Sequence, residues 1–310
     1  ITTFQPPLNY NVSAIVATNT TVYVGGAFNF VGGATRNRLA AFDPAGKLLG
    51  WTANTDGTVH AMVMAPGGTK LIVGGAFTTV NGLPQYGMAA LDVTTGKVLP
   101  WAATTTVRDA GANSAIMSLS ADATNVYGTG YVFGKGGNLE GAFAAKGTTG
   151  DIVWIEDCHG DTYSNVPING LLYTVSHAHY CATIGGFPET KPNFTTYGHA
   201  LAFTTKATGT VKTTPPGGNY FDFGGNPSPS LANWYPELLT GTFTGATQAA
   251  WSITGNSTYI VLGGEFPKVN GIAQQGLVRF AVKPTGPGKV GPKLGGAAFV
   301  PTLTVVPTGI

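Results

Sequence analysis

Histidines and acidic residues gather between positions 158 and 199 of this chain. Four of its five histidines fall there, and the spacing of His177 and His179 places both on one face of a β-strand. His159 and Asp161 form a second pair with the same spacing. Imidazole and carboxylate groups brought together in this way suit either a divalent metal or general acid–base chemistry.

The two cysteines of the chain, Cys158 and Cys181, each lie within three residues of one of these pairs. A disulfide between them would hold the pairs together, and an even number of cysteines in a charge-poor chain is typical of exported proteins. Three interpretations of the joined pairs stay open. They are a zinc or calcium site, acid–base catalysis by His177 and His179, or histidines that only hydrogen-bond the backbone. The candidate metal ligands are His159, Asp161, His177 and His179.

A repeated segment predicts the elements that position this cluster. Residues 22–46 read VYVGGAFNFVGGATRNRLAAFDPAG, residues 71–96 read LIVGGAFTTVNGLPQYGMAALDVTTG, and residues 260–280 read IVLGGEFPKVNGIAQQGLVRF. Gly25 and Gly74 are 49 residues apart, about the length of one propeller blade. Short β-branched strands separated by Gly, Asn and Asp turns indicate an all-β fold. We therefore predict a β-propeller of four-stranded blades.

Five repeat units can be traced, so five blades are preferred, with six as the alternative. Their approximate bounds, within a single domain over 1–296, are 9–57, 58–111, 112–160, 161–238 and 239–296. Residues 297–310 are expected to close the last blade or to form a linker to a following module. Residues 2–7 are the alternative closing strand. The phenylalanine after each Gly-Gly pair is expected to fill the core between blades: Phe28, Phe77 and Phe266.

The pattern V-G-G-x-F-x-x-V-N-G…L-A-A-L-D…G…W resembles the delta-60-repeat β-propellers of exported bacterial proteins and is similar to the cortical-marker propellers of fungi. It is strong in the first, second and fifth units and partial in the others. The C-H-G-D-T…S-H-A-H-Y-C stretch looks like a feature of an actinobacterial subgroup, in which such propellers often precede immunoglobulin-like or carbohydrate-binding modules. The resemblance implies the fold and export, and no assured activity.

Glu265 is a further candidate for the site. It stands where the first two units have Ala27 and Ala76, and equivalent positions of a propeller lie around one rim or the central channel. We therefore expect Glu265 to face a common pocket with His177 and His179, as a catalytic candidate beside them. The alternative is that Glu265 lies on a loop in solvent.

The fourth unit also contains an aromatic and proline-rich insertion around residues 213–238. We expect Tyr220, Trp234 and Tyr235 to form a surface on which a sugar ring stacks, with a lid packed on the enlarged blade as the alternative. A glycosidase would also need two carboxylates, and the candidates are Asp161, Glu189, Asp222 and Glu265.

Composition narrows the class of protein. Charged residues make up only 10% of the chain, the net charge is +2, and there is no basic run, so a nucleic-acid partner is not expected. The sequence contains no run of about 18 apolar residues, so it predicts no membrane-spanning helix. The paired cysteines and the Asn-x-Ser/Thr sites favour an extracellular or cell-surface location.

Together these patterns predict an extracellular propeller module that binds carbohydrate or a cell-wall polymer near its fourth unit. One alternative is a polysaccharide-acting hydrolase or lyase that uses histidine, carboxylate or metal chemistry. The other is a structural spacer in a surface protein or filament. Other modules of the same polypeptide are further expected partners.

Overall fold

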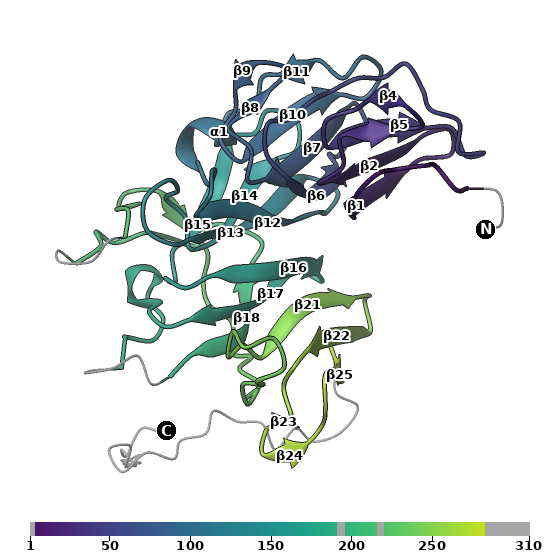
Figure 1. The fold of residues 1–310 in the computed structure, drawn as a ribbon. Coiled ribbons are helices and arrows are strands. Elements are labelled where there is room, and N and C mark those ends of the chain that lie inside the picture. Colours follow the sequence, from purple (N-terminus) through teal and green to yellow (C-terminus); the bar gives the residue numbers. More distant parts are fainter. Residues whose placement is uncertain (1–3, 191–195, 216–219, 283–310) are drawn as a thin grey trace, which may run out of the picture.

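The computed structural model describes residues 4–190, 196–215 and 220–282, and the regular secondary structure of these residues is almost entirely β-strand. Five antiparallel sheets follow one another along the chain in an arc (Figure 1). Each sheet lies within one of the five repeat units predicted above. We number them sheet 1 to sheet 5 in chain order.

The first three sheets hold most of the regular strands. Sheet 1 contains β1 (Val12–Ala17), β2 (Val22–Gly26) and β5 (Leu39–Phe42). Sheet 2 contains β6 (Val59–Met64), β7 (Lys70–Gly75), β10 (Met88–Asp92) and β11 (Val98–Leu99). Sheet 3 contains β12 (Ser114–Ala121), β13 (Asn125–Val132), β14 (Gly141–Lys146) and β15 (Ile152–Glu156). Sheets 2 and 3 thus have the four strands expected of a blade.

Sheets 4 and 5 have three strands each. Sheet 4 contains β16 (Thr162–Ile168), β17 (Leu171–Ala178) and β18 (Gly198–Thr204), and sheet 5 contains β21 (Ala250–Gly255), β22 (Tyr259–Gly264) and β25 (Leu277–Ala281). A short pair, β19 (Gly209–Thr210) and β20 (Pro227–Ser228), lies in the insertion. The helical elements of the described residues are the single turn α1 (Ala103–Thr106) and a 3-10 turn over Ala182–Ile184.

The Asn-Gly and Gly-Gly loops form small hairpins. These are β3 (Phe30–Val31) with β4 (Ala34–Thr35), β8 (Thr79–Val80) with β9 (Leu83–Pro84), and β23 (Lys268–Val269) with β24 (Ile272–Ala273). Asn81 and Gly82 have φ values of 52° and 77°. Positive φ at both central residues is what a two-residue hairpin turn requires, and asparagine and glycine tolerate it best.

The first strand of every sheet bulges at the same point. The strand register shifts by one residue in β1, β6, β12, β16 and β21. The bulged residues are Ser13, His60, Met117, Tyr163 and Trp251. A bulge turns a side chain away from the regular alternation. Two of these residues, Tyr163 and Trp251, reach the candidate site described below.

Glycine allows the sheets to approach one another closely. A Cβ added to Gly25 would lie 2.7 Å from Cγ1 of Val59 in sheet 2, and one added to Gly74 would lie 2.7 Å from Cγ2 of Ile116 in sheet 3. The three phenylalanines predicted to fill the core are fully buried, which confirms that prediction: Phe28, Phe77 and Phe266.

The main sheet-to-sheet contacts run in chain order, from sheet 1 to sheet 5. Sheets 1 and 5 therefore lie at the two ends of the arc (Figure 1). Near the N-terminus, Phe4 and Leu8 pack on the outer face of sheet 1, where Leu8 forms a single bridge with Val31. The closing strand predicted over 297–310 lies outside the described residues, and the number of blades in a closed ring stays a prediction. Among the residues described, none of the helices is long and apolar enough to cross a membrane.

Candidate functional site

The candidate site lies where sheet 4 begins, at the loop 157–161 between β15 and β16. Beyond the regular ladder, the amide N–H groups of His177 and His179 donate to the carbonyls of Asp161 and His159, at 3.1 and 2.9 Å. The predicted Cys158–Cys181 disulfide is present and ends this paired extension. The disulfide therefore brings the two predicted pairs onto adjacent segments.

The backbone of this loop is unusual at two consecutive residues. His159 has a φ of 41°, in the left-handed region that residues other than glycine rarely adopt, and Gly160 follows with 130°. A Cβ on Gly160 would lie 2.5 Å from the carbonyl oxygen of His177, so only glycine fits there. Such strain is kept where the surrounding structure fixes it, here next to the disulfide.

Tyr220 is held in place by two of the histidines. Its ring stacks on the imidazole of His159, with centroids 3.9 Å apart and planes 12° apart. Its hydroxyl lies 3.1 Å from Nε2 of His179, and Nδ1 of His179 lies 3.3 Å from a carboxylate oxygen of Glu189. Glu189 thus orients His179, and His179 orients the Tyr220 ring.

The protonation states of this trio oppose proton transfer. Burial, followed by the nearby His159, lowers the pKa of His179 to about 4, and burial raises the pKa of Tyr220. At neutral pH the proton therefore stays on the tyrosine hydroxyl, which donates to a neutral imidazole. The arrangement fixes an aromatic ring and leaves Tyr220 unactivated as a base.

His177 and His199 make hydrogen bonds of a structural kind. Nε2 of His177 accepts the N–H of Asp161 at 3.2 Å, and its Nδ1 lies 2.8 Å from the hydroxyl of the bulged Tyr163 and 3.1 Å from the Gln248 amide. Nδ1 of His199 lies 3.2 Å from a backbone carbonyl of β17. Burial lowers the pKa of both imidazoles, so both are neutral at pH 7. The contact of His199 matches the backbone-bonding interpretation, whereas His177 also bonds the side chains of Tyr163 and Gln248.

The four candidate metal ligands do not converge on one point. Within the described ranges, the one set of three or more potential ligands whose atoms lie within 4.8 Å of one another is Glu156, Cys158 and Cys181. Because both cysteines are in the disulfide, neither offers a thiolate. The rings of His159 and His179 are 6.3 Å apart. The zinc or calcium site stays a prediction that this arrangement of side chains does not favour.

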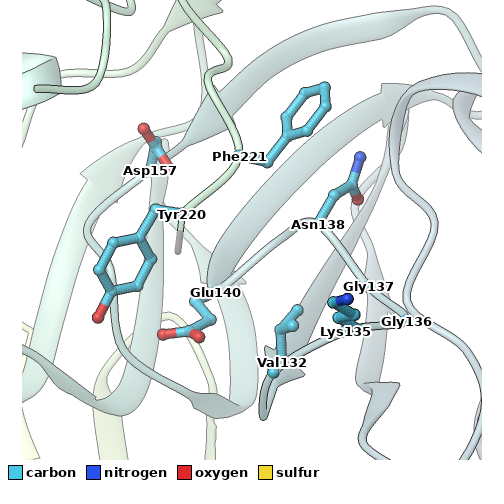
Figure 2. A pocket seen from close by; sticks show the side chains of 10 residues that line it. Val132, Lys135, Gly136, Gly137, Asn138, Glu140, Asp157, Tyr220 and Phe221 are labelled. Carbon is cyan, nitrogen blue, oxygen red and sulfur yellow. The ribbon is translucent and has the colours of Figure 1, made fainter. Parts of the chain in front are cut away.

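A pocket of about 400 Å³ opens beside this cluster (Figure 2). Its lining residues are Val132, Gly134–Asn138, Glu140, Asp157, Tyr220 and Phe221. Figure 2 shows Glu140, Asp157 and Tyr220 along one side, across from the loop that carries Lys135 to Gly137. The pocket therefore combines a fixed aromatic ring with two carboxyl groups.

The carboxyl groups differ in their surroundings. Asp157 is buried, with Oδ1 3.6 Å from Nε2 of His159, and its buried Oδ2 has no hydrogen-bond partner among the described residues. Burial and then the charge of Asp161 raise the pKa of Glu140 to about 8, while the Gly160 amide donates to it. Burial raises the pKa of Asp161 to about 6. At neutral pH Glu140 is therefore mostly protonated and Asp161 mostly ionised.

Asp109 anchors the glycine-rich wall of the pocket. Its Oδ1 accepts the N–H groups of Asn138 and Leu139 at 2.8 and 3.0 Å. In sheet 2, Asp56 accepts two consecutive N–H groups in the same way. Asp109 is fully buried, and its Oδ2 lacks a partner within the described part of the chain. Burial raises its pKa to about 7.

Glu265 does not line this pocket. Its carboxylate accepts hydrogen bonds from the N–H and hydroxyl of Thr244 and from the Trp251 indole, and the Thr244 N–H is the main cause of its lowered pKa. The Trp251 ring lies 4.6 Å from that of Tyr163, which in turn bonds His177. Glu265 is thus connected to the histidines through two aromatic residues, without direct contact.

The structure separates the three predicted aromatic residues. Tyr220 alone lines the pocket. Trp234 packs edge-on against Tyr173 and Phe280, in the core between sheets 4 and 5, and Tyr235 is 51% exposed. A single stacking surface made by all three residues is therefore not what the structure shows.

Sequence reasoning missed Glu140 and Asp157. Glu140 directly precedes Gly141, which pairs with Gly130 at the site edge of sheet 3, in the most degenerate repeat unit. The corresponding residues of units one, two and five are Asn37, Tyr86 and Gln275, so an acidic residue at this position was a usable signal. Asp157 adjoins Cys158 and could have been included with the disulfide-linked segment.

Comparisons with known proteins bear on the fold alone. No known family and no curated protein matches the sequence. The WD40 domain of Neurospora crassa Pan2 matches with a TM-score of 0.42 and 10% identity, over 82% of this chain and 59% of that one. BamB from Moraxella catarrhalis matches with a TM-score of 0.36 and 16% identity, over 86% of this chain and 82% of its own. The computationally designed Ika8 protein matches with a TM-score of 0.40 and 14% identity, over 87% of this chain and 71% of that one.

These solved structures are β-propellers, but similarity at this level carries no argument about family or activity. The propeller-like, all-β class of this chain rests on its five sequential sheets. The delta-60-repeat resemblance has no family match behind it.

Proposed function

We propose that this chain is an extracellular propeller module, of the delta-60-repeat kind, that binds carbohydrate in the pocket beside the Cys158–Cys181 disulfide. One observation carries the proposal. The Tyr220 ring, fixed by His159 and His179, lines a pocket whose wall contains a buried Asp157 oxygen without a partner in the described structure.

The chemistry of the pocket fits a sugar. An aromatic ring offers an apolar surface for the C–H face of a pyranose, and carboxyl groups bond its hydroxyls. Asp157 supplies acceptor oxygens, while a protonated Glu140 supplies both a donor and an acceptor. A volume of about 400 Å³ lies in the range of small-ligand pockets.

Binding is favoured over catalysis by the state of Tyr220, whose proton is retained at neutral pH. An enzyme acting on polysaccharide is the second candidate, because Glu140 and Asp161 have pKa values of about 8 and about 6. One protonated and one ionised carboxyl near pH 7 is the pattern of an acid–base pair. Release of reducing sugars from the bound glycan, lost in Glu140→Gln, would establish this candidate instead.

The test is a glycan array of plant, fungal and bacterial cell-wall oligosaccharides, followed by calorimetry with the strongest binder. Tyr220→Ala is expected to weaken binding about tenfold, and Asp157→Asn to weaken it because an acceptor oxygen is replaced by a donor. Tyr220→Phe keeps the ring and should bind more tightly than Tyr220→Ala. Tyr10→Ala removes an exposed tyrosine far from the pocket and serves as the control. Equal affinity of Tyr220→Ala and wild type would refute the proposal.

A further inference from the structure

One face of sheet 5 has no neighbouring sheet among the described residues. We call it the open face of sheet 5, and its residues are Tyr259, Val261, Gly263, Leu277, Arg279 and Ala281. Arg279 lies over the Tyr259 ring and stands where sheets 1 and 2 have the buried Ala41 and Ala90. Leu277 is 59% exposed, whereas Leu39 and Met88, at the same repeat position of sheets 1 and 2, are fully buried. The repeat thus preserves an apolar contact position whose partner is missing here.

The contacts between earlier sheets show what that partner looks like. Between sheets 1 and 2 and between sheets 2 and 3, a glycine of one sheet receives two apolar side chains, three residues apart, from the first strand of the next sheet; sheets 3 and 4 have Thr129 and Val175 at that position. A Cβ added to the glycine would come within 2.7 to 3.2 Å of both: Val59 and Met62 for Gly25, Ile116 and Leu119 for Gly74.

Gly263 is the equivalent glycine of sheet 5. It occupies the position of Gly25 and Gly74 in the repeat, yet a Cβ added to Gly263 would meet no described residue within 4 Å. Its φ lies outside the left-handed region, so its own backbone does not require glycine. The absence of a side chain at this position is therefore best explained by a close neighbour, as at the two equivalent glycines.

The matching pair of apolar side chains is exposed at the other end of the arc. The register of β1 places Val12 and Ile15 where β6 has Val59 and Met62. Val12 is 36% exposed and Ile15 62% exposed, while Val59 and Met62 are buried by the preceding sheet. Each molecule thus carries both halves of one more sheet-to-sheet contact, and residues 4–190, 196–215 and 220–282 fill neither half.

We propose that the open face of sheet 5 binds β1 of a second copy of this chain, with Val12 and Ile15 packed on Gly263. The occupant is inferred from continuity with the contacts between sheets 1 and 2 and between sheets 2 and 3. Sheets 1 and 5 lie at opposite ends of the arc (Figure 1), and within the described part of the chain β1 does not reach the Gly263 position of the same molecule. The contact joins two different surfaces, so copies associate head to tail.

Sedimentation of the purified chain over a range of concentrations tests the proposal. For wild type, the average mass of the sedimenting species is expected to increase with protein concentration. Gly263→Val is expected to remain a monomer, because the added side chain occupies the contact. The valine meets no neighbour among the residues that the structure describes, so the variant should keep the wild-type melting temperature. Gly74→Val, at the filled equivalent position, should instead be destabilised. Ile15→Lys blocks the contact from the other side and should also give a monomer.

An engineered disulfide identifies the strand that binds. The chain has no free cysteine among its described residues, and at the equivalent contact the Cβ position of Gly25 lies 3.3 Å from Cβ of Val59, close to disulfide spacing. Val12→Cys with Gly263→Cys is expected to give covalent dimers and larger species under oxidation. A monomer at every concentration, or a bond formed within one molecule, would overturn the proposal. The latter result would show closure of the ring by the chain's own strand.

Discussion

Replacing Glu156 by glutamine is expected to flatten the pH dependence of this protein's stability. The Glu156 side chain is buried at the end of β15, and its Oε1 accepts the N–H of Cys158 at 3.0 Å. Burial, and then the charge of Asp157, raise its pKa from 4.5 to about 8. Glutamine keeps the size of the side chain and the acceptor for Cys158, and it removes only the ionisation.

The sign follows from which state loses its proton first. Below about pH 4 Glu156 is protonated in both the folded and the unfolded chain, so it has no effect. As the pH rises from there to about 8, the unfolded chain ionises while the folded chain does not, and stability falls. A pKa difference of about 3.5, at about 1.4 kcal/mol per pKa unit, limits the loss to about 5 kcal/mol. Most of that loss, roughly 3 kcal/mol, is expected between pH 5 and pH 8.

Urea unfolding of wild type and Glu156→Gln at pH 5 and pH 8 measures this difference. Glu140, Asp109 and Asp161 also have raised pKa values and act in the same direction, but they are present in both proteins. The difference between the two pH dependences therefore isolates Glu156. Identical pH dependences would refute the assignment of Glu156 as a buried acid that is neutral in the folded state.

Three further changes have expected outcomes. Phe77→Ala empties a fully buried position and should lower the free energy of unfolding by about 3–5 kcal/mol, while Phe243→Ala, at a 95% exposed residue, should have almost no effect in the same urea titration. Replacing both Cys158 and Cys181 by serine removes a disulfide between residues 23 apart and should lower the free energy of unfolding by roughly 3 kcal/mol, measured by calorimetry. The same variant should bind glycan more weakly, because the loop 157–161 is no longer held by the disulfide. Asp109→Ala should cost about 1–3 kcal/mol because two buried N–H groups lose their acceptor, whereas Asp109→Asn keeps Oδ1 and should be close to wild type.

The repeat made the scaffold predictable. Phe77 and its two equivalents are buried as expected, Asn81-Gly82 forms the expected tight hairpin, and the Gly-Gly pairs of sheets 1 and 2 lie where sheets approach closely. Each of these follows from a local rule about side-chain size or backbone φ, repeated in several units. The Cys158–Cys181 disulfide was predictable because the chain has only two cysteines.

The site was harder to predict because it depends on distances that no spacing encodes. A two-residue spacing put His177 and His179 near each other, but it did not reveal that Tyr163 and Gln248 bind the first and Tyr220 the second. Those partners come from segments 14 to 71 residues away. Tyr220 and Trp234 likewise look equivalent in the insertion, although one lines the pocket and the other enters the core.

The site uses positions that every unit of the repeat possesses. The bulge in the first strand, which holds Ser13 in sheet 1, holds Tyr163 in sheet 4 and places its hydroxyl on His177. Asp56 accepts backbone N–H groups from the loop after β7, and we call this contact a brace. Asp109 forms the same brace with the loop after β13, where it holds the wall of the pocket. Because these positions are already fixed by packing, substitutions there acquire defined geometry without new backbone. Polar residues at the bulge and brace positions of a repeat unit are therefore a better guide to its site than histidine spacing alone.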